Sequence, residues 1–128
     1  MCLIALRGAK DFLADDSIEF HALEDHHIFP RAYLARSKQT DGSIYPSSQV
    51  NCVVNRTLIT SYANRRISRM SPSQYVQQLV PDERRRDLME SHFITADALD
   101  AMQADDFEAF LLHREQALVQ EIRRQLTV

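Results

Sequence analysis

The first half of the chain shows a pattern of apolar and polar positions that predicts two strands. Residues 18–29 alternate apolar and polar side chains at their start and end in two apolar residues, as an extended segment does. Residues 50–60 are rich in β-branched side chains and predict the second strand. Between them, a short helix is predicted at residues 31–36, directly after Pro30, and a loop at residues 37–49.

The rest of the chain has helical periodicity. A helix is predicted at residues 2–14, and Ser61 is the predicted N-cap of another at residues 62–70, before a break at residues 71–73. Further helical segments are predicted at residues 74–80, 82–91, 95–102 and from residue 105 onward. The last helix carries an apolar stripe made of Phe107, Phe110, Leu111, Ala117, Leu118, Ile122 and Leu126. This stripe predicts packing against the core.

Composition indicates one folded domain. The chain has 128 residues, of which 45% are apolar, enough for a single hydrophobic core. We therefore expect one domain over residues 1–128, with a core at 1–80 and C-terminal helices at 81–128. Cys2 and Cys52 form no CxxC pair, which argues against a zinc site of Cys ligands and favours a reducing cytoplasm. The apolar opening of the chain is too short to span a membrane.

Charge is unevenly distributed along the chain. The whole sequence has a net charge of −3, but residues 26–70 contain seven Arg or Lys residues and one acidic residue, a net of +6. Such a patch can meet a phosphate backbone even on an acidic protein. The alternative is a solvated face whose arginines pair with the acidic flanking segments.

Four polar residues lie where the predicted elements meet. His26 and His27 lie near the end of the first strand. Asn55 lies in the second strand segment, and Asn64 lies in the first turn of the following helix. Taken singly, such histidines are usually surface or packing residues, and such asparagines are usually turn or cap residues. Their combination on a strand–loop–strand–helix frame suggests a site.

The four residue types suit hydrolysis of a phosphodiester. An imidazole exchanges protons at neutral pH, which fits His27 as the general base that takes a proton from water. The imidazole of His26 and the amide oxygen of Asn64 fit a hydrated divalent cation, foremost Mg²⁺ and otherwise Mn²⁺, Ni²⁺ or Zn²⁺. Since neighbouring residues on a strand face opposite ways, both histidines can reach one phosphate only if the strand ends or bends there. The nearby Pro30 is consistent with such an end.

The sequence around these positions resembles the HNH (ββα-metal) nuclease family. Residues 26–34, HHIFPRAYL, are similar to the Asp-His-Ile-Val-Pro…Phe-Leu start of HNH domains, including the one in RNA-guided CRISPR effector nucleases. Asn55 and Asn64 stand nine residues apart, as the second and third signature positions do there. Residues 8–12 (GAKDF), 55–58 (NRTL) and 72–75 (PSQY) are similar, more closely, to the C-terminal HNH domain of GmrSD-type restriction proteins. The resemblance covers roughly residues 1–80.

The resemblance implies a role for each of the four residues. His26 stands at the first metal-ligand position, where many relatives have Asp, and His27 stands at the base position. Asn55 stands at the middle position, which orients the site loop and the base. Asn64 stands at the last ligand position, where other HNH nucleases have His. A frame shifted by one residue would pair Asp25 with His26, but the Ile-x-Pro that follows favours His26 with His27.

We therefore expect an α+β fold in which a ββα-metal core is wrapped by further helices. The expected function is metal-dependent endonucleolytic cleavage of DNA in bacterial or phage defence or restriction, with Arg31, Arg65 and Arg66 contacting phosphates. The alternative is a non-catalytic DNA-binding or assembly module that keeps the HNH frame.

The same resemblance implies candidate binding partners for this protein. GmrSD-type proteins carry a large N-terminal nucleotide-hydrolysing domain, and this sequence contains no GxxxxGK[ST] run that would supply one. A separate nucleotide-hydrolysing domain or subunit is therefore a candidate partner beside DNA, and a homodimer is a further alternative.

Overall fold

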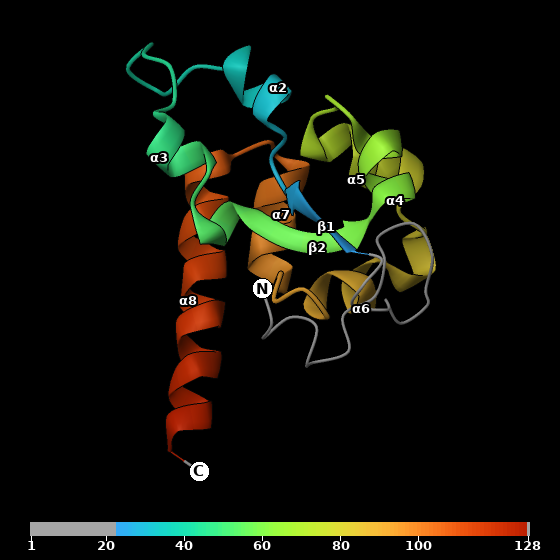
Figure 1. Cartoon of the computed structure of the whole chain (residues 1–128), viewed down its shortest axis with the longest axis vertical. Helices are drawn as coiled ribbons and strands as arrows, with labels where there is room; N and C mark the ends of the chain where they lie inside the picture. Colours follow the sequence, from blue (N-terminus) through green and yellow to red (C-terminus); the bar gives the residue numbers. More distant parts are fainter. Residues whose placement is uncertain (1–22, 128) are drawn as a thin grey trace.

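The computed structural model describes residues 23–127 of the chain. The predicted helix at residues 2–14 and the start of the first predicted strand lie outside the described residues. Within residues 23–127, helices surround a two-stranded antiparallel sheet of β1 (Leu23–His27) and β2 (Arg56–Thr60) (Figure 1). The expected α+β class is therefore confirmed at this level.

The remaining described elements are helices and short 3-10 turns. They are α2 (Arg31–Ala35), α3 (Ser47–Val50), η2 (Val53–Asn55), α4 (Ser61–Ile67), α5 (Pro72–Leu79), η3 (Asp82–Arg84), α6 (Arg85–Glu90), α7 (Ala96–Gln103) and α8 (Phe107–Leu126). Helices α2 and α7 lie close to their predicted bounds. The predicted segment at residues 82–91 is divided into η3 and α6, and α8 begins at Phe107 with Asp106 as its N-cap.

The sheet joins the two predicted strand segments. Leu23 pairs with Thr60 and His27 pairs with Arg56, so the ladder covers the whole of β1. The first predicted strand is confirmed over its described end, although it stops at His27 rather than Phe29. Both histidines are paired within the ladder, so their side chains leave opposite faces of β1, and the strand ends directly after the second of them.

The second strand is shorter than predicted. Residues 50–55 end α3 and form η2, so the prediction of a strand from residue 50 is wrong for this stretch. Val53 and Val54 favour strands by their branched side chains, but β1 offers only five partner residues. The carbonyls of the turn instead accept side-chain hydrogen bonds, including one from Arg114 Nη1 to Val54 at 2.6 Å. Tertiary contacts therefore override the local preference.

Helix α4 follows β2 directly and contacts both strands (Figure 1). Its N-cap is Thr60, whose hydroxyl accepts a hydrogen bond from the backbone amide three residues later at 3.1 Å. The predicted cap at Ser61 is therefore wrong by one residue. The helix also ends earlier than Met70, because Ser68 adopts a φ of 50° that a right-handed helix does not contain.

Two predicted loop segments contain helical residues. Helix α3 occupies the end of the predicted loop at residues 37–49. The predicted break at residues 71–73 is the start of α5, with Pro72 in its first turn. Ser71 and Gln74 form a reciprocal capping box there, which explains why these residues begin a helix rather than interrupt one.

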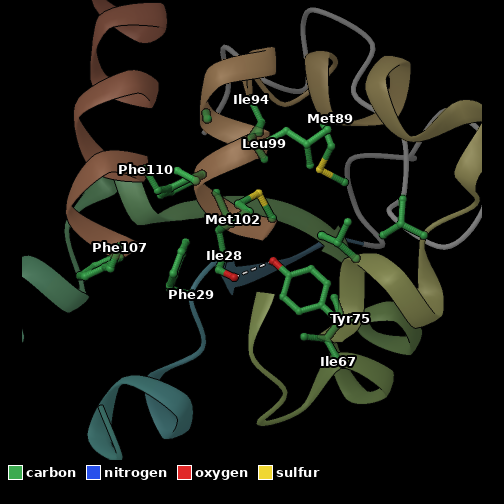
Figure 2. Packing of buried hydrophobic residues seen from close by; sticks show 14 of the residues in the cluster. Ile28, Phe29, Ile67, Tyr75, Met89, Ile94, Leu99, Met102, Phe107 and Phe110 are labelled. Atoms are coloured by element: carbon green, nitrogen blue, oxygen red, sulfur yellow. Dashed lines mark hydrogen bonds between the residues drawn. The ribbon is translucent and has the colours of Figure 1, made fainter. Parts of the chain in front are cut away.

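The core fixes the end of β1 between the helices. The ring of Phe29 lies 5.1 Å from that of Phe107 and 5.2 Å from that of Phe110, measured between centroids. The hydroxyl of Tyr75 on α5 donates to the carbonyl of Ile28 at 2.6 Å (Figure 2). All five side chains are buried, so the residues directly after β1 are held from two sides.

The buried apolar residues of the last helix lie in its first half. Phe107 and Phe110 are buried as predicted, whereas Ile122 is 50% exposed and Leu126 is 80% exposed. Helix α8 has 20 residues and its C-terminal turns extend past the other described elements (Figure 1). The prediction of a continuous buried stripe is therefore wrong for the end of the helix. Among the described residues, no helix combines the length and apolar character needed to cross a membrane.

Candidate functional site

His26 and Asn64 lie together on the α4 side of the hairpin. His26 Nδ1 is 2.9 Å from Oδ1 of Asn64, although 38 positions separate the two residues along the chain. His26 is only 2% exposed, and its ring packs edge-on against that of Tyr75 with centroids 6.1 Å apart. The structure therefore brings together the two residues that the sequence predicts as metal ligands.

Burial sets the protonation state of His26. It lowers the pKa of the imidazole to about 4, although the hydrogen bond to Asn64 acts in the opposite direction. The nearby charge of His27 lowers this pKa further. His26 is therefore neutral at pH 7, which is the state in which an imidazole binds a metal ion.

His27 has a different partner. It is the last residue of β1, it is partly exposed, and its Nε2 lies 2.8 Å from Oδ1 of Asn51 in the turn after α3. An amide oxygen accepts a hydrogen bond, so Nε2 carries the proton in this contact and Nδ1 is the nitrogen that can accept another. Asn51 was not among the sequence-predicted residues, and nothing in its local sequence distinguishes it from an ordinary turn residue.

Asn55 is fully buried and braces the end of β1. Its Oδ1 accepts from the amide of Phe29 at 2.8 Å, and its Nδ2 donates to the carbonyls of Phe29 at 3.2 Å and Val50 at 2.9 Å. These bonds tie the residues after His27 to the end of α3. Asn55 thus contacts the backbone on both sides of the turn, and its role in orienting the site loop and the base stays a prediction.

Arg114 of α8 holds the same turn from the other side. It is fully buried and donates to the carbonyls of Val53, Val54 and Arg56, and also to that of His92, over distances of 2.6 to 3.3 Å. Burial lowers the pKa of Arg114 to about 10, so the guanidinium stays charged at neutral pH.

No role was predicted for Arg114 from the sequence, although its spacing from core residues of the same helix indicates a buried position. Arg114 stands seven positions after Phe107 and four after Phe110, so it lies on the same helical face as these core residues. A charged residue at a core position of an amphipathic helix is a candidate for a buried polar contact.

The three predicted DNA-contacting arginines are exposed. Arg31 begins α2 and lines a hollow of about 730 Å³ that Asn51 also lines. Arg65 and Arg66 lie on α4, and Arg66 donates to the hydroxyl of Tyr62 at 2.9 Å. Within residues 23–127, neither Arg65 nor Arg66 forms an ion pair with a carboxylate. The alternative prediction was that these arginines pair with acidic residues of the C-terminal helices, and the described residues contain no such ion pair.

The spacing of His26 Nδ1 and Asn64 Oδ1 matches that of two neighbouring ligands of a small divalent cation, because octahedral ligands at about 2.1 Å from an ion lie about 3.0 Å apart, close to the 2.9 Å here. In this contact Nδ1 carries a proton and donates it to Oδ1, so an ion would have to take the place of that proton. No three His, Cys, Asp or Glu side chains form a metal-binding cluster in the described part of the chain.

Comparison with known proteins gives one relative of unknown role. The chain is 28% identical to the uncharacterized protein MJ0686 of Methanocaldococcus jannaschii over 94% of its own length. The match covers 24% of that protein, so the chain spans about a quarter of the relative's length. No family model matches the chain, and no solved structure matches it.

Proposed function

We propose that this chain is a metal-dependent HNH-type endonuclease that hydrolyses DNA phosphodiester bonds. The observation that carries the proposal is the contact between His26 and Asn64, which joins two chemically suitable ligands on a hairpin followed directly by a helix. His27 adjoins this pair at the end of β1, beside a partly exposed surface.

In the proposed reaction, His27 Nδ1 accepts a proton from a water molecule as the water oxygen attacks phosphorus. The P–O bond to the leaving sugar oxygen breaks on the opposite side, and that oxygen takes a proton from solvent. A divalent cation held by His26 and Asn64 would offset the negative charge that develops on the phosphate and the leaving oxygen.

The neighbouring residues orient the reacting groups and the substrate and do not themselves accept the proton or hold the cation. Asn51 accepts from Nε2 of His27 and so orients the imidazole, as the third member of a nucleophile–base arrangement does. Asn55 and Arg114 hold the turn that carries Asn51. Arg31, Arg65 and Arg66 are exposed and would contact the phosphate backbone. A role in defence or restriction, a cytoplasmic location, a homodimer and a nucleotide-hydrolysing partner remain predictions.

A second candidate function is a non-catalytic module that keeps the HNH frame. The observation that favours it is the burial of His26, since a ring that is 2% exposed and packed against Tyr75 could serve structure alone. In that case the contact with Asn64 is an ordinary hydrogen bond between hairpin and helix.

Cleavage of supercoiled plasmid separates the two candidates. We expect nicked product in Mg²⁺ or Mn²⁺ and none after EDTA treatment, with activity restored when metal is added back. Binding of DNA without nicking in any divalent metal would favour the non-catalytic module. Nicking that persists in EDTA would contradict the cation's role.

A further inference from the structure

Glu24 shares a face of β1 with His26. The two residues are separated by one position on a regular strand, so their side chains leave the same side of the hairpin. Asn64 contacts both of them, with Oδ1 at 2.9 Å from His26 Nδ1 and Nδ2 donating to Glu24 Oε2 at 3.2 Å. The three side chains form a line from the buried His26 through the half-buried Asn64 to the exposed Glu24.

Glu24 adds a negative charge to the neutral pair of His26 and Asn64. Imidazole and carboxamide are neutral donors and do not offset the charge of a divalent cation. Carboxylate oxygens are the ligands that hard divalent cations prefer in proteins. Glu24 brings a carboxylate to the amide nitrogen of Asn64, and because the side chain is exposed, a change of rotamer would carry the carboxylate from this hydrogen bond toward an ion beside Oδ1.

Asp25 is unsuited to the same task. It alternates with Glu24 along β1 and therefore points to the opposite face of the hairpin. There it is paired with the guanidinium of Arg56. The two adjacent carboxylates of the strand thus have separate surroundings, and only one of them lies beside Asn64.

We propose that Glu24 is the third protein ligand of a divalent cation site completed by His26 and Asn64. This inference rests on the proposed function, which places the cation at the other two residues. The site has one nitrogen donor, one amide oxygen and one carboxylate oxygen. Such a mixed set suits Mn²⁺ and related first-row ions better than Ca²⁺, which takes more oxygen ligands.

Calorimetric titration with Mn²⁺ alone tests the assignment on the full chain without DNA. We expect Glu24→Gln to weaken Mn²⁺ binding roughly tenfold or more, on the scale by which changes to metal-site residues act. Asp25→Asn is the matched control, because it removes the same charge one position along the strand, and it should leave the affinity within about twofold of wild type. Melting temperatures in EDTA show that both variants fold.

The outcomes separate this inference from the proposed function. Equal weakening by E24Q and D25N would mean that general charge rather than ligation acts, and would overturn the role of Glu24. Unchanged binding by E24Q would overturn it as well, while leaving His26 and Asn64 as ligands. Failure of the wild type to bind Mn²⁺ would overturn the cation site altogether, and the proposed function with it.

Discussion

Two histidine–asparagine pairs lie on opposite sides of the end of β1. His26 with Asn64 is buried against a helix, whereas His27 with Asn51 is partly exposed beside a turn. The residue types are the same, but the surroundings make one imidazole neutral and inaccessible to bulk water and leave the other open to it. Environment rather than residue type therefore divides the proposed roles of metal ligand and proton acceptor.

The two pairs also differ in what supports them. Asn64 belongs to a helix whose N-cap, Thr60, is the last residue of β2, so its place follows from local sequence. Asn51 belongs to a turn that is held by Asn55 and by Arg114 from α8. The position of the His27–Asn51 pair therefore depends on α8, which is distant in the sequence. The position of the His26–Asn64 pair depends mainly on the hairpin itself.

The largest expected effect is on the His27 side. Changing His27 to Ala should lower the rate of plasmid nicking by about a hundred- to ten-thousand-fold, because it removes the proposed proton acceptor. The melting temperature should change little, since the ring is partly exposed. His113→Ala, which removes another partly exposed histidine on α8, is the control and should keep wild-type rates. Activity of H27A within a few-fold of wild type would remove His27 from the base position.

Arg114 provides the next test, now of stability. Replacement by Met should lower the free energy of unfolding by about 2–4 kcal/mol, because several buried carbonyls lose their donor, even though a buried charge is also removed. Urea titration measures this change. Arg123→Met, at an exposed position on the same helix, should cost less than about 0.5 kcal/mol. Similar small losses in both variants would show that Arg114 does not hold the turn.

The pH dependence of stability tests the His26 side. The folded pKa of His26 is about 4 and its ordinary value is 6.5, so the unfolded chain binds the extra proton between these values. The stability that burial of the neutral ring allows is present above pH 6.5 and is lost as the pH falls toward 4. With EDTA present, urea titrations should show a loss of about 3 kcal/mol from this group. His26→Gln should flatten the profile, and a variant profile parallel to wild type would contradict this origin.

A smaller effect is expected at Asn51. Changing it to Ala should lower kcat about tenfold with little change in KM, because the imidazole of His27 loses its orienting partner. Asn51→Asp should restore part of the rate and raise the lower pH limit of kcat, since a carboxylate favours the imidazolium. Gln49→Ala, at a partly exposed neighbouring position on α3, serves as control. A change confined to KM would assign Asn51 to substrate binding instead.

The smallest expected effect concerns the exposed arginines of α4. Changing Arg65 and Arg66 together to Ala should reduce the slope of log affinity against log salt by about one unit, since residues adjacent on a helix diverge and one of them should dominate. Arg86→Ala with Arg123→Ala removes the same charge from exposed positions on α6 and α8. An equal slope change in both double variants would indicate a general charge effect without local phosphate contacts.

Local sequence was enough to place the hairpin, its following helix and the polar residues at their junctions. Local signals depend on residues only a few positions apart: the strand and helix periodicities, Pro30 and the capping residue types. They therefore predict α2, α7 and the end of β1 closely. The same patterns put His26, His27, Asn55 and Asn64 near the ends of elements without showing which would meet.

Only the tertiary structure decided the partners and their surroundings. The contact of His26 with Asn64 spans 38 positions, that of His27 with Asn51 spans 24, and that of Arg114 with Val54 spans 60. Contacts over such distances depend on how the helices pack around the hairpin, which no local period encodes. The same packing folds the valine-rich stretch before β2 into a turn, although its side chains favour a strand. It also leaves the apolar residues at the end of α8 exposed, although their spacing favours burial.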